Sequence, residues 1–218
     1  SIAFNKKISK NKILTEGIQN INLTDILYAK KFNYKIKLLS ISEIRMNRLI
    51  ERVHPCLVPN RSFLSNIGGV LNAVVIDGLP VGKSVFQGEG AGPGPTSSAL
   101  ISDLCSILRG NIKYPFGISS KLRKKIVKFD ILKHISSSYF RIEVKDLPGV
   151  LSSITKIFAK NKISIKNLLQ NPDKKNKKAT IIIITHKNLE KNYNNLFSNL
   201  TKNKFVLKKP TFIRIEKV

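Results

Sequence analysis

The order of hydrophobic patterns after residue 138 constrains the fold more than any other feature of this chain. Strand-like apolar patterns lie at 139–144, 163–169, 179–185 and within 205–216. Helical repeats with one apolar face begin at Val150 and at Leu189. An apolar spacing of two predicts a strand, and a spacing of three and four predicts a helix. The resulting order of strand, helix, strand, strand, helix, strand predicts a split βαβ, ferredoxin-like domain at 139–218.

The first 112 residues also combine helices with strands. We expect a short helix that ends near Asn33, with the Thr24 hydroxyl as its N-cap, because this hydroxyl precedes an apolar-periodic run. Strand patterns follow at 34–42, 48–57, 69–78 and 84–87. The valine-rich stretch 69–78 ends in the turn dipeptide Asp77-Gly78, as a buried strand does. The helix and strand patterns in both halves of the chain therefore predict the α+β class.

A glycine-rich turn, Gly88-Glu89-Gly90-Ala91-Gly92-Pro93-Gly94-Pro95-Thr96, leads into a helical repeat at 97–109. Thr96 is the expected N-cap and Gly110 the expected stop. Glycines let a ligand approach the backbone, and a helix N-terminus favours an anion such as phosphate. The motif lacks the Lys-Ser/Thr ending of a P-loop and the spacing of a Rossmann fingerprint. A tight strand-to-helix turn without any ligand fits these residues equally well.

Periodicity weakens between the two parts of the chain, where the basic stretch Lys121-Leu122-Arg123-Lys124-Lys125 lies. We therefore predict a first domain at 1–112, a linker at 113–138 and a second domain at 139–218.

The formal net charge of +26, from 39 Lys and Arg against 13 Asp and Glu, raises the question of a nucleic-acid or membrane partner. The lysines are spread along the whole chain among many Asn and Ile residues, which indicates a compositional bias at solvent-facing positions. We expect neither partner. No apolar run approaches the roughly 20 residues that span a bilayer, and the first residues do not have the pattern of a signal peptide. A cytoplasmic location is the simplest interpretation.

The single residues that could carry chemistry have plainer explanations. Cys56 and Cys105 lack a C-x-x-C spacing or a nearby histidine cluster, so we expect reduced thiols and no metal site. Asp25 and Lys31 suit solvated positions of a helix rather than an acid and a proton donor. Lys35 and Lys37 suit charges that flank a sheet. The histidines are expected to be packed or hydrogen-bonded side chains rather than general bases; they are His54, His134 and His186.

Several ordered segments in about the first 110 residues resemble bacterial homoserine dehydrogenases. They are Thr15-Glu16-Gly17-Ile18, 25–29, Tyr34-Lys35-Ile36-Lys37-Leu38-Leu39, His54-Pro55, Asn72-Ala73-Val74 and 88–99. The resemblance implies a catalytic and dimerisation sheet with helices, a homo-oligomer, and NADP or NAD as cofactor. It also implies the interconversion of aspartate semialdehyde and homoserine, a hydride transfer in the biosynthesis of threonine, methionine and isoleucine.

The same resemblance limits which residues can be assigned. The family's Asp-x-x-x-Lys signature and its substrate-binding acidic residue lie just upstream of Ser1. The dinucleotide fingerprint, which the family carries at its own amino terminus, is also missing here. We therefore assign no catalytic residue and expect a fragment that is inactive alone, whose helix at 97–109 exposes an apolar face. Gly92 matches the family's glycine near the cofactor. Glu89, Gly90 and Ala91 are its neighbours and further candidates for cofactor contact.

The second domain resembles ACT regulatory domains through Asp146-Leu147-Pro148-Gly149-Val150-Leu151 at a strand-to-helix turn. The resemblance implies allosteric binding of a small amino acid, with threonine expected, whose carboxylate would lie on the helix N-terminus near Gly149 and Val150. Asp146 and Leu151 complete the candidate effector site. The lysine- and asparagine-rich loop at 171–178 departs from many ACT domains, and a domain that only dimerises is the alternative. A stand-alone amino-acid-sensing or nucleic-acid-binding module is the alternative function for the chain.

Overall fold

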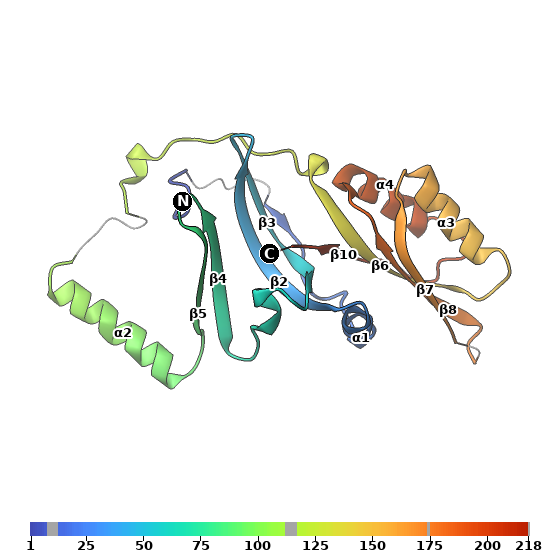
Figure 1. The fold of residues 1–218 in the computed structure, drawn as a ribbon, viewed down its shortest axis with the longest axis horizontal. Coiled ribbons are helices and arrows are strands. Elements are labelled where there is room, and N and C mark those ends of the chain that lie inside the picture. The colour runs from blue at the N-terminus through green and yellow to red at the C-terminus, as the bar shows by residue number, and fades with distance from the viewer. Residues whose placement is uncertain (8–12, 112–116, 174, 218) are drawn as a thin grey trace. The chain divides into compact units, whose positions relative to one another are not determined.

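The computed structural model describes residues 1–7, 13–111, 117–173 and 175–217 (Figure 1). Its contacts divide the chain into two compact units. The hairpin unit comprises Ser1–Lys10 and Asn66–Ile126, and the sheet unit comprises Asn11–Ser65 and Val127–Val218. These units do not follow the predicted division at 112 and 138, because the segment from 11 to 65 packs with the carboxyl-terminal region.

The sheet unit contains the predicted ferredoxin-like element order. Its strands are β1 (Leu14–Thr15), β2 (Tyr34–Arg45), β3 (Arg48–Pro59), β6 (Ile135–Lys145), β7 (Ile165–Asp173), β8 (Lys178–Thr185), β9 (Asn188–Leu189) and β10 (Thr211–Ile215). Its α-helices are α1 (Leu23–Lys31), α3 (Val150–Lys160) and α4 (Glu190–Thr201). The strand order β7-β8-β6-β10, antiparallel throughout, confirms the split βαβ arrangement and the α+β class.

The sheet continues beyond the ferredoxin-like part into the first half of the chain. Strand β10 pairs in parallel with β3, with Arg214 opposite Cys56 and Ile215 opposite Leu57. Strand β3 in turn pairs antiparallel with β2 along its whole length, from Arg48 to Pro59. This pairing between distant segments explains why residues 11–65 belong to the same compact unit as the carboxyl-terminal region.

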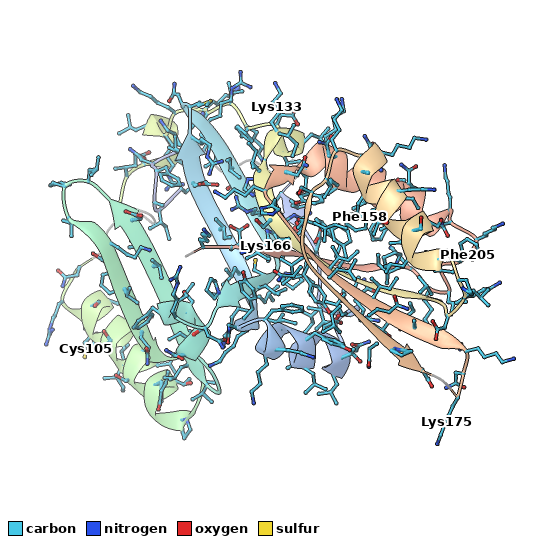
Figure 2. All side chains as sticks on the ribbon, turned by 45° about the vertical axis from the view of Figure 1, so that its right-hand side comes forward. Cys105, Lys133, Phe158, Lys166, Lys175 and Phe205 are labelled. Atoms are coloured by element: carbon cyan, nitrogen blue, oxygen red, sulfur yellow. The ribbon has the colours of Figure 1, made fainter. Side chains whose placement is uncertain are left out.

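Both faces of the central strands are buried. Along β8, Ile181 and Ile183 pack with Phe158 of α3, while Ile182 and Ile184 pack in a second core that contains Ala29 of α1. Helices α3 and α4 lie together beside the strands in Figure 1, and Figure 2 shows Phe158 between its helix and the sheet. A strand that is covered on both faces needs no polar alternation, which accounts for the continuous apolar run of β8.

Helix α1 starts and packs differently from the sequence prediction. Its N-cap is Asn22, in a reciprocal capping box with Asp25, rather than Thr24. Asp25 is fully buried and binds the Arg141 guanidinium and the Tyr139 hydroxyl, so its assignment to a solvated position was wrong. The cause is the adjacent strand β6, because it brings a cation and a hydroxyl to this face of the helix. The stop near Asn33 is confirmed, with φ of 62° at that residue.

The strands and the helix of the hairpin unit, unlike those of the sheet unit, are not buried. Strands β4 (Leu71–Gly78) and β5 (Gly82–Glu89) form an antiparallel hairpin, followed by helix α2 (Pro93–Leu108). No residue of these three elements is buried, so the prediction of a buried strand at 69–78 was wrong. The unit offers these strands no second apolar layer. The apolar helix face is exposed as expected; its residues are Leu100, Ile101, Leu104, Ile107 and Leu108.

The ends of α2 correct one predicted cap and confirm the other. The helix begins at Pro93 with Gly92 as its N-cap, so Thr96 lies inside the first turn. A proline at the first helical position suits its fixed φ and missing N–H, which explains the earlier start. Gly110, with φ of +71°, follows the end of the helix as predicted. Within the described part of the chain, no helix has the length and hydrophobicity needed to cross a membrane.

Candidate functional site

The glycine-rich turn of the hairpin unit joins the end of β5 to the start of α2. The Gly90 N–H donates to the Val70 carbonyl at 2.8 Å, which closes the open end of the hairpin. Gly92 has φ of 119° and ψ of 160°, a conformation that strains any residue with a side chain. Glu89, Gly90, Ala91 and Gly92 are all exposed, so their backbone is open to a ligand.

The helix N-terminus at this turn offers fewer amides than a typical anion site. Pro93 and Pro95 have no N–H, and the Thr96 N–H already donates to the Gly92 carbonyl at 3.2 Å. Gly94 therefore supplies the single amide of the first three helical positions. The turn suits close contact between its backbone and a flat group, and it suits a phosphate less well than the sequence suggested.

The turn between β6 and α3 holds the four predicted effector residues. Gly149 is the N-cap of α3, with φ of 83° and no side-chain hydrogen bond. Val150 is buried, Leu151 is exposed, and the Asp146 N–H donates to the Lys177 carbonyl at 3.0 Å. Leu151 lies in the first turn of the helix, where amides lack intrahelical acceptors. The Val150 N–H already donates to the Leu147 carbonyl at 3.3 Å, so the geometry is that of a short turn at a helix N-terminus with only some of its amides open.

The sequence analysis missed a charged network within the sheet unit. Arg214 on β10 is 2% exposed and donates to both carboxylate oxygens of Glu16, at 2.7 and 2.9 Å. It also donates to Glu190, at the start of α4, at 3.1 Å through Nε and by a second bond through Nη2. Burial disfavours the charge of Arg214, but the bonds to Glu190 and Glu16 raise its pKa overall.

The same network continues along β3 through Arg52. Its Nη1 donates to Glu43 at 2.9 Å, and its Nη2 lies 3.2 Å from both carboxylate oxygens of Glu216. Burial, which disfavours the charged form, raises the pKa of Glu216 although Arg52 opposes the shift. Two buried arginines thus contact four carboxylates; these are Glu16, Glu43, Glu190 and Glu216.

Two of the three histidines lie against this network. His54 is fully buried and His134 is 3% exposed, which agrees with the packed side chains predicted for both. Burial and the charge of Arg214 lower the pKa of His54 to about 4. Burial and the charge of Arg52 lower the pKa of His134 to about 4. Both rings are therefore neutral at pH 7. His186 is exposed, so of the two predicted environments, packed or hydrogen-bonded, the packed one is wrong for this ring.

The structure also brings together three side chains that could bind a metal ion, although their spacing in the sequence did not indicate it. His54, Cys56 and Glu216 each offer a ligand atom, and these atoms lie within 4.8 Å of one another. Burial raises the pKa of the Cys56 thiol, which stays protonated, and both cysteines are free as expected. The sequence signal for the charged network was the presence of Arg52 and Arg214 within the strands β3 and β10. The wide separation of the network residues along the chain, from Glu16 to Glu216, hid it.

Two pockets open on the sheet unit. One, of about 510 Å³, lies between the segment after β1 and helix α4, with Gln19, Phe197 and Arg214 among its lining residues. The other, of about 490 Å³, has Arg52, His134 and Glu216 in its wall. The second pocket gives the charged network a route to solvent.

The fold and the two turns define an α+β protein in which a hairpin, a glycine turn and a helix accompany an ACT-type ferredoxin-like domain. Comparison with known proteins agrees with this class. The family described as homoserine dehydrogenase matches residues 1–105, and the family described as ACT domain matches residues 138–202.

Individual relatives extend the match over nearly the whole chain. Homoserine dehydrogenase of Helicobacter pylori is 36% identical over 216 residues, which cover 99% of this chain and 51% of that protein. The Pseudomonas aeruginosa enzyme is 31% identical, over 92% of this chain and 48% of that protein. The crystal structure of a homoserine dehydrogenase from Thiobacillus denitrificans superposes with a TM-score of 0.84 at 32% identity, covering 99% of this chain and 50% of that one.

The chain belongs to the homoserine dehydrogenase family and includes an ACT domain. It spans about half the length of the curated relatives it matches. Family membership leaves the roles of its individual residues a separate question.

Proposed function

We propose that this chain forms the dimerising and regulatory part of an NAD(P)-dependent homoserine dehydrogenase. The complete enzyme would interconvert L-aspartate 4-semialdehyde and L-homoserine in the cytoplasm, on the pathway to threonine, methionine and isoleucine. The observation that supports this most strongly is the TM-score of 0.84 over 99% of the chain with a homoserine dehydrogenase. The division into a dehydrogenase region at 1–112, a linker at 113–138 and a regulatory domain at 139–218 is part of the proposal.

The glycine-rich turn is the part of this chain that we assign to the cofactor. Gly92 and its neighbours Glu89, Gly90 and Ala91 present exposed backbone without bulky side chains, which fits close contact with the nicotinamide ring. The paucity of amides at the start of α2 argues that the phosphates are held elsewhere. When bound, the cofactor supplies the hydride, and this turn limits how the ring can tilt against the substrate.

A complementation experiment tests the enzymatic proposal. The 218-residue chain alone should not oxidise homoserine with NADP or NAD. A chimera in which the nucleotide-binding half of the Helicobacter pylori enzyme precedes Ser1 should do so. In that chimera, Gly92→Val should raise the KM for the cofactor at least about tenfold, since a branched side chain is strained at this φ and occupies the contact surface. Turnover by the 218-residue chain itself would contradict the proposal that it is the dimerising and regulatory part of the enzyme.

The turn before α3 is the part that we assign to a regulatory amino acid, with threonine as the proposed effector. A carboxylate placed near Gly149 and Val150 would gain from the dipole of α3 and from the amides of its first turn, of which the Val150 N–H is shared with the Leu147 carbonyl. The neighbouring Asp146 and Leu151 would border the bound amino acid. A homo-oligomer, in which ACT domains of two subunits meet, is the proposed assembly.

Calorimetry with threonine tests the regulatory assignment. Gly149→Asp should abolish heat of binding, because it adds a negative charge beside the proposed carboxylate position. Gly110→Asp is a matched control, since Gly110 also has a positive φ and open space around its Cβ position. Equal loss in both variants, or no binding by the unaltered chain, would favour a domain that only dimerises.

A further inference from the structure

The buried network of the sheet unit contains a gap between three atoms that no hydrogen bond fills. His54 Nε2 lies 4.0 Å from Oε1 of Glu216, and His134 Nε2 lies 3.9 Å from the same oxygen. Neither nitrogen has a hydrogen-bond partner among the described residues, and neither is reached by solvent. Such orphaned buried groups are rare in folded proteins, so their convergence on one carboxylate oxygen calls for an explanation.

The proton on the His54 ring can be assigned from its other nitrogen. Nδ1 lies 3.1 Å from the Pro55 carbonyl oxygen, and a carbonyl can only accept, so Nδ1 carries the proton. In the neutral ring, Nε2 is then a lone pair. It faces the lone pairs of the Glu216 carboxylate across 4.0 Å, an arrangement that is repulsive unless something positive lies between them.

We propose that His54 Nε2, His134 Nε2 and Oε1 of Glu216 bind a zinc ion. Two imidazole nitrogens and one carboxylate oxygen are a common zinc donor set, with bonds of about 2.0–2.1 Å. A tetrahedral ion with such bonds separates its ligands by about 3.3 Å, so the two gaps to Oε1 of Glu216 need to close by about 0.6–0.7 Å. The His134 ring lies outside the group of donors within 4.8 Å that His54, Cys56 and Glu216 form, so it also has to turn toward His54.

The surroundings have two properties of a zinc site. First, the hydrogen bond from Nδ1 of His54 to the Pro55 carbonyl fixes the ring and its tautomer, as outer partners of metal-bound histidines do. Second, the pocket of about 490 Å³ that has His134 and Glu216 in its wall supplies an entry path. The Cys56 sulfur lies on the Nδ1 side of His54, at 3.2 Å, so it supports the ring rather than binding the ion.

Charge is the strongest objection to a cation here, because Arg52 and Arg214 are close. With Arg45, which also contacts Glu43, three arginines face four glutamates, so the network keeps one negative charge in excess. A divalent ion more than balances that excess. Arg52 holds Glu43 at 2.9 Å but Glu216 at 3.2 Å, longer than the usual charge-assisted bond, so Oε1 of Glu216 is free to turn toward an ion.

Metal analysis of the purified 218-residue chain tests the site without any activity measurement, and so independently of the proposed dehydrogenase function. After treatment with a chelator and dialysis, the chain should take up about one zinc ion in competition with a chromophoric chelator. His54→Gln and His134→Gln should each weaken binding about 100-fold or more, since even changes to outer partners cost about 10–100-fold. His186→Gln, at the exposed third histidine, is the matched control and should bind like the unaltered chain.

Cobalt gives a second readout that needs no variant. The Co²⁺-loaded chain should show the visible absorption of a tetrahedral site without a thiolate charge-transfer band, because Cys56 is not a ligand. A strong thiolate band would overturn the assignment of the ligands. Zinc uptake far below one ion per chain, or equal loss in all three histidine variants, would overturn the site itself. Circular dichroism identifies any variant that fails to fold, and the zinc content and cobalt spectrum of the unaltered chain then decide.

Discussion

The hairpin unit and the sheet unit have similarly apolar elements but bury them to opposite extents. Helix α2 has five large apolar residues at helical spacing and none of its residues is buried. Helix α3, with a comparable pattern, buries Val150, Ile154 and Phe158. The difference teaches that an amphipathic pattern specifies a helix, while burial depends on whether the chain supplies a second layer.

The largest difference in stability between the two units is expected when a large apolar side chain is removed from each. Phe158→Ala should lower the free energy of unfolding by about 3–5 kcal/mol, because it leaves a cavity under α3. Leu104→Ala on the exposed face of α2 should change it by less than about 0.5 kcal/mol. Urea unfolding followed by circular dichroism measures both. Similar losses for the two variants would mean that α2 is covered in solution.

Removing an aspartate from each unit should give the next largest difference in the free energy of unfolding. Asp25→Ala leaves the Arg141 guanidinium without its buried partner and should cost about 3 kcal/mol. Asp77→Ala, at an exposed position of the hairpin, should cost less than about 0.5 kcal/mol. If Asp25→Ala is as mild as its control, Arg141 finds other partners and the ion pair does not anchor α1.

Acid should destabilise the sheet unit, because the two buried histidines, His54 and His134, belong to it. The pKa values of His54 and His134 are lowered to about 4, so the unfolded chain binds more protons than the folded chain below the usual value near 6.5. Stability should therefore fall as the pH drops from about 6.5 toward 4, with a slope of up to about 1.4 kcal/mol per pH unit for each histidine. Urea unfolding of the chelator-treated chain at pH 7, 6 and 5 measures this slope.

The histidine origin of that slope can be checked with one variant. His54→Gln should flatten the pH dependence between pH 5 and 6.5, and His186→Gln, at an exposed ring, should leave it unchanged. An unaltered slope in His54→Gln would assign the pH dependence to other groups.

The smallest predicted contrast concerns the helix caps of the two units. Asn22→Ala removes the side-chain bond that caps α1 and should cost about 1 kcal/mol. Thr96→Ala should cost less than about 0.5 kcal/mol, because Gly92 rather than Thr96 caps α2. Thermal unfolding of both variants measures the difference. A larger effect for Thr96→Ala would mean that α2 starts later in solution.

Sequence patterns predicted well where the signal is local. The element order after residue 138 was confirmed, as were the stops at Asn33 and Gly110, since periodicity and positive φ depend on residues close in the chain. The two glycine turns were likewise found from their residues. Their ligands stay proposals, because a turn with free amides does not by itself identify what binds.

Patterns failed where burial depends on a distant segment. Asp25 was expected in solvent and the strand at 69–78 in the core, and the structure shows the reverse for both. No residue near Asp25 in the sequence indicates its ion pair with Arg141, which lies 116 residues away. The valines of β4 have the composition of a buried strand, but composition does not provide the layer that would cover them.

By itself, the sequence determined the class of the fold and the family, because both depend on ordered local motifs such as Asp146-Leu147-Pro148-Gly149 and the glycine turn that ends at Thr96. Only the tertiary structure decided that β10 pairs with β3 and that Glu16, His54, His134 and Glu216 surround the same two arginines. The physical reason is the length of chain between these residues. Long-range strand pairing brings them together, and no local periodicity encodes it.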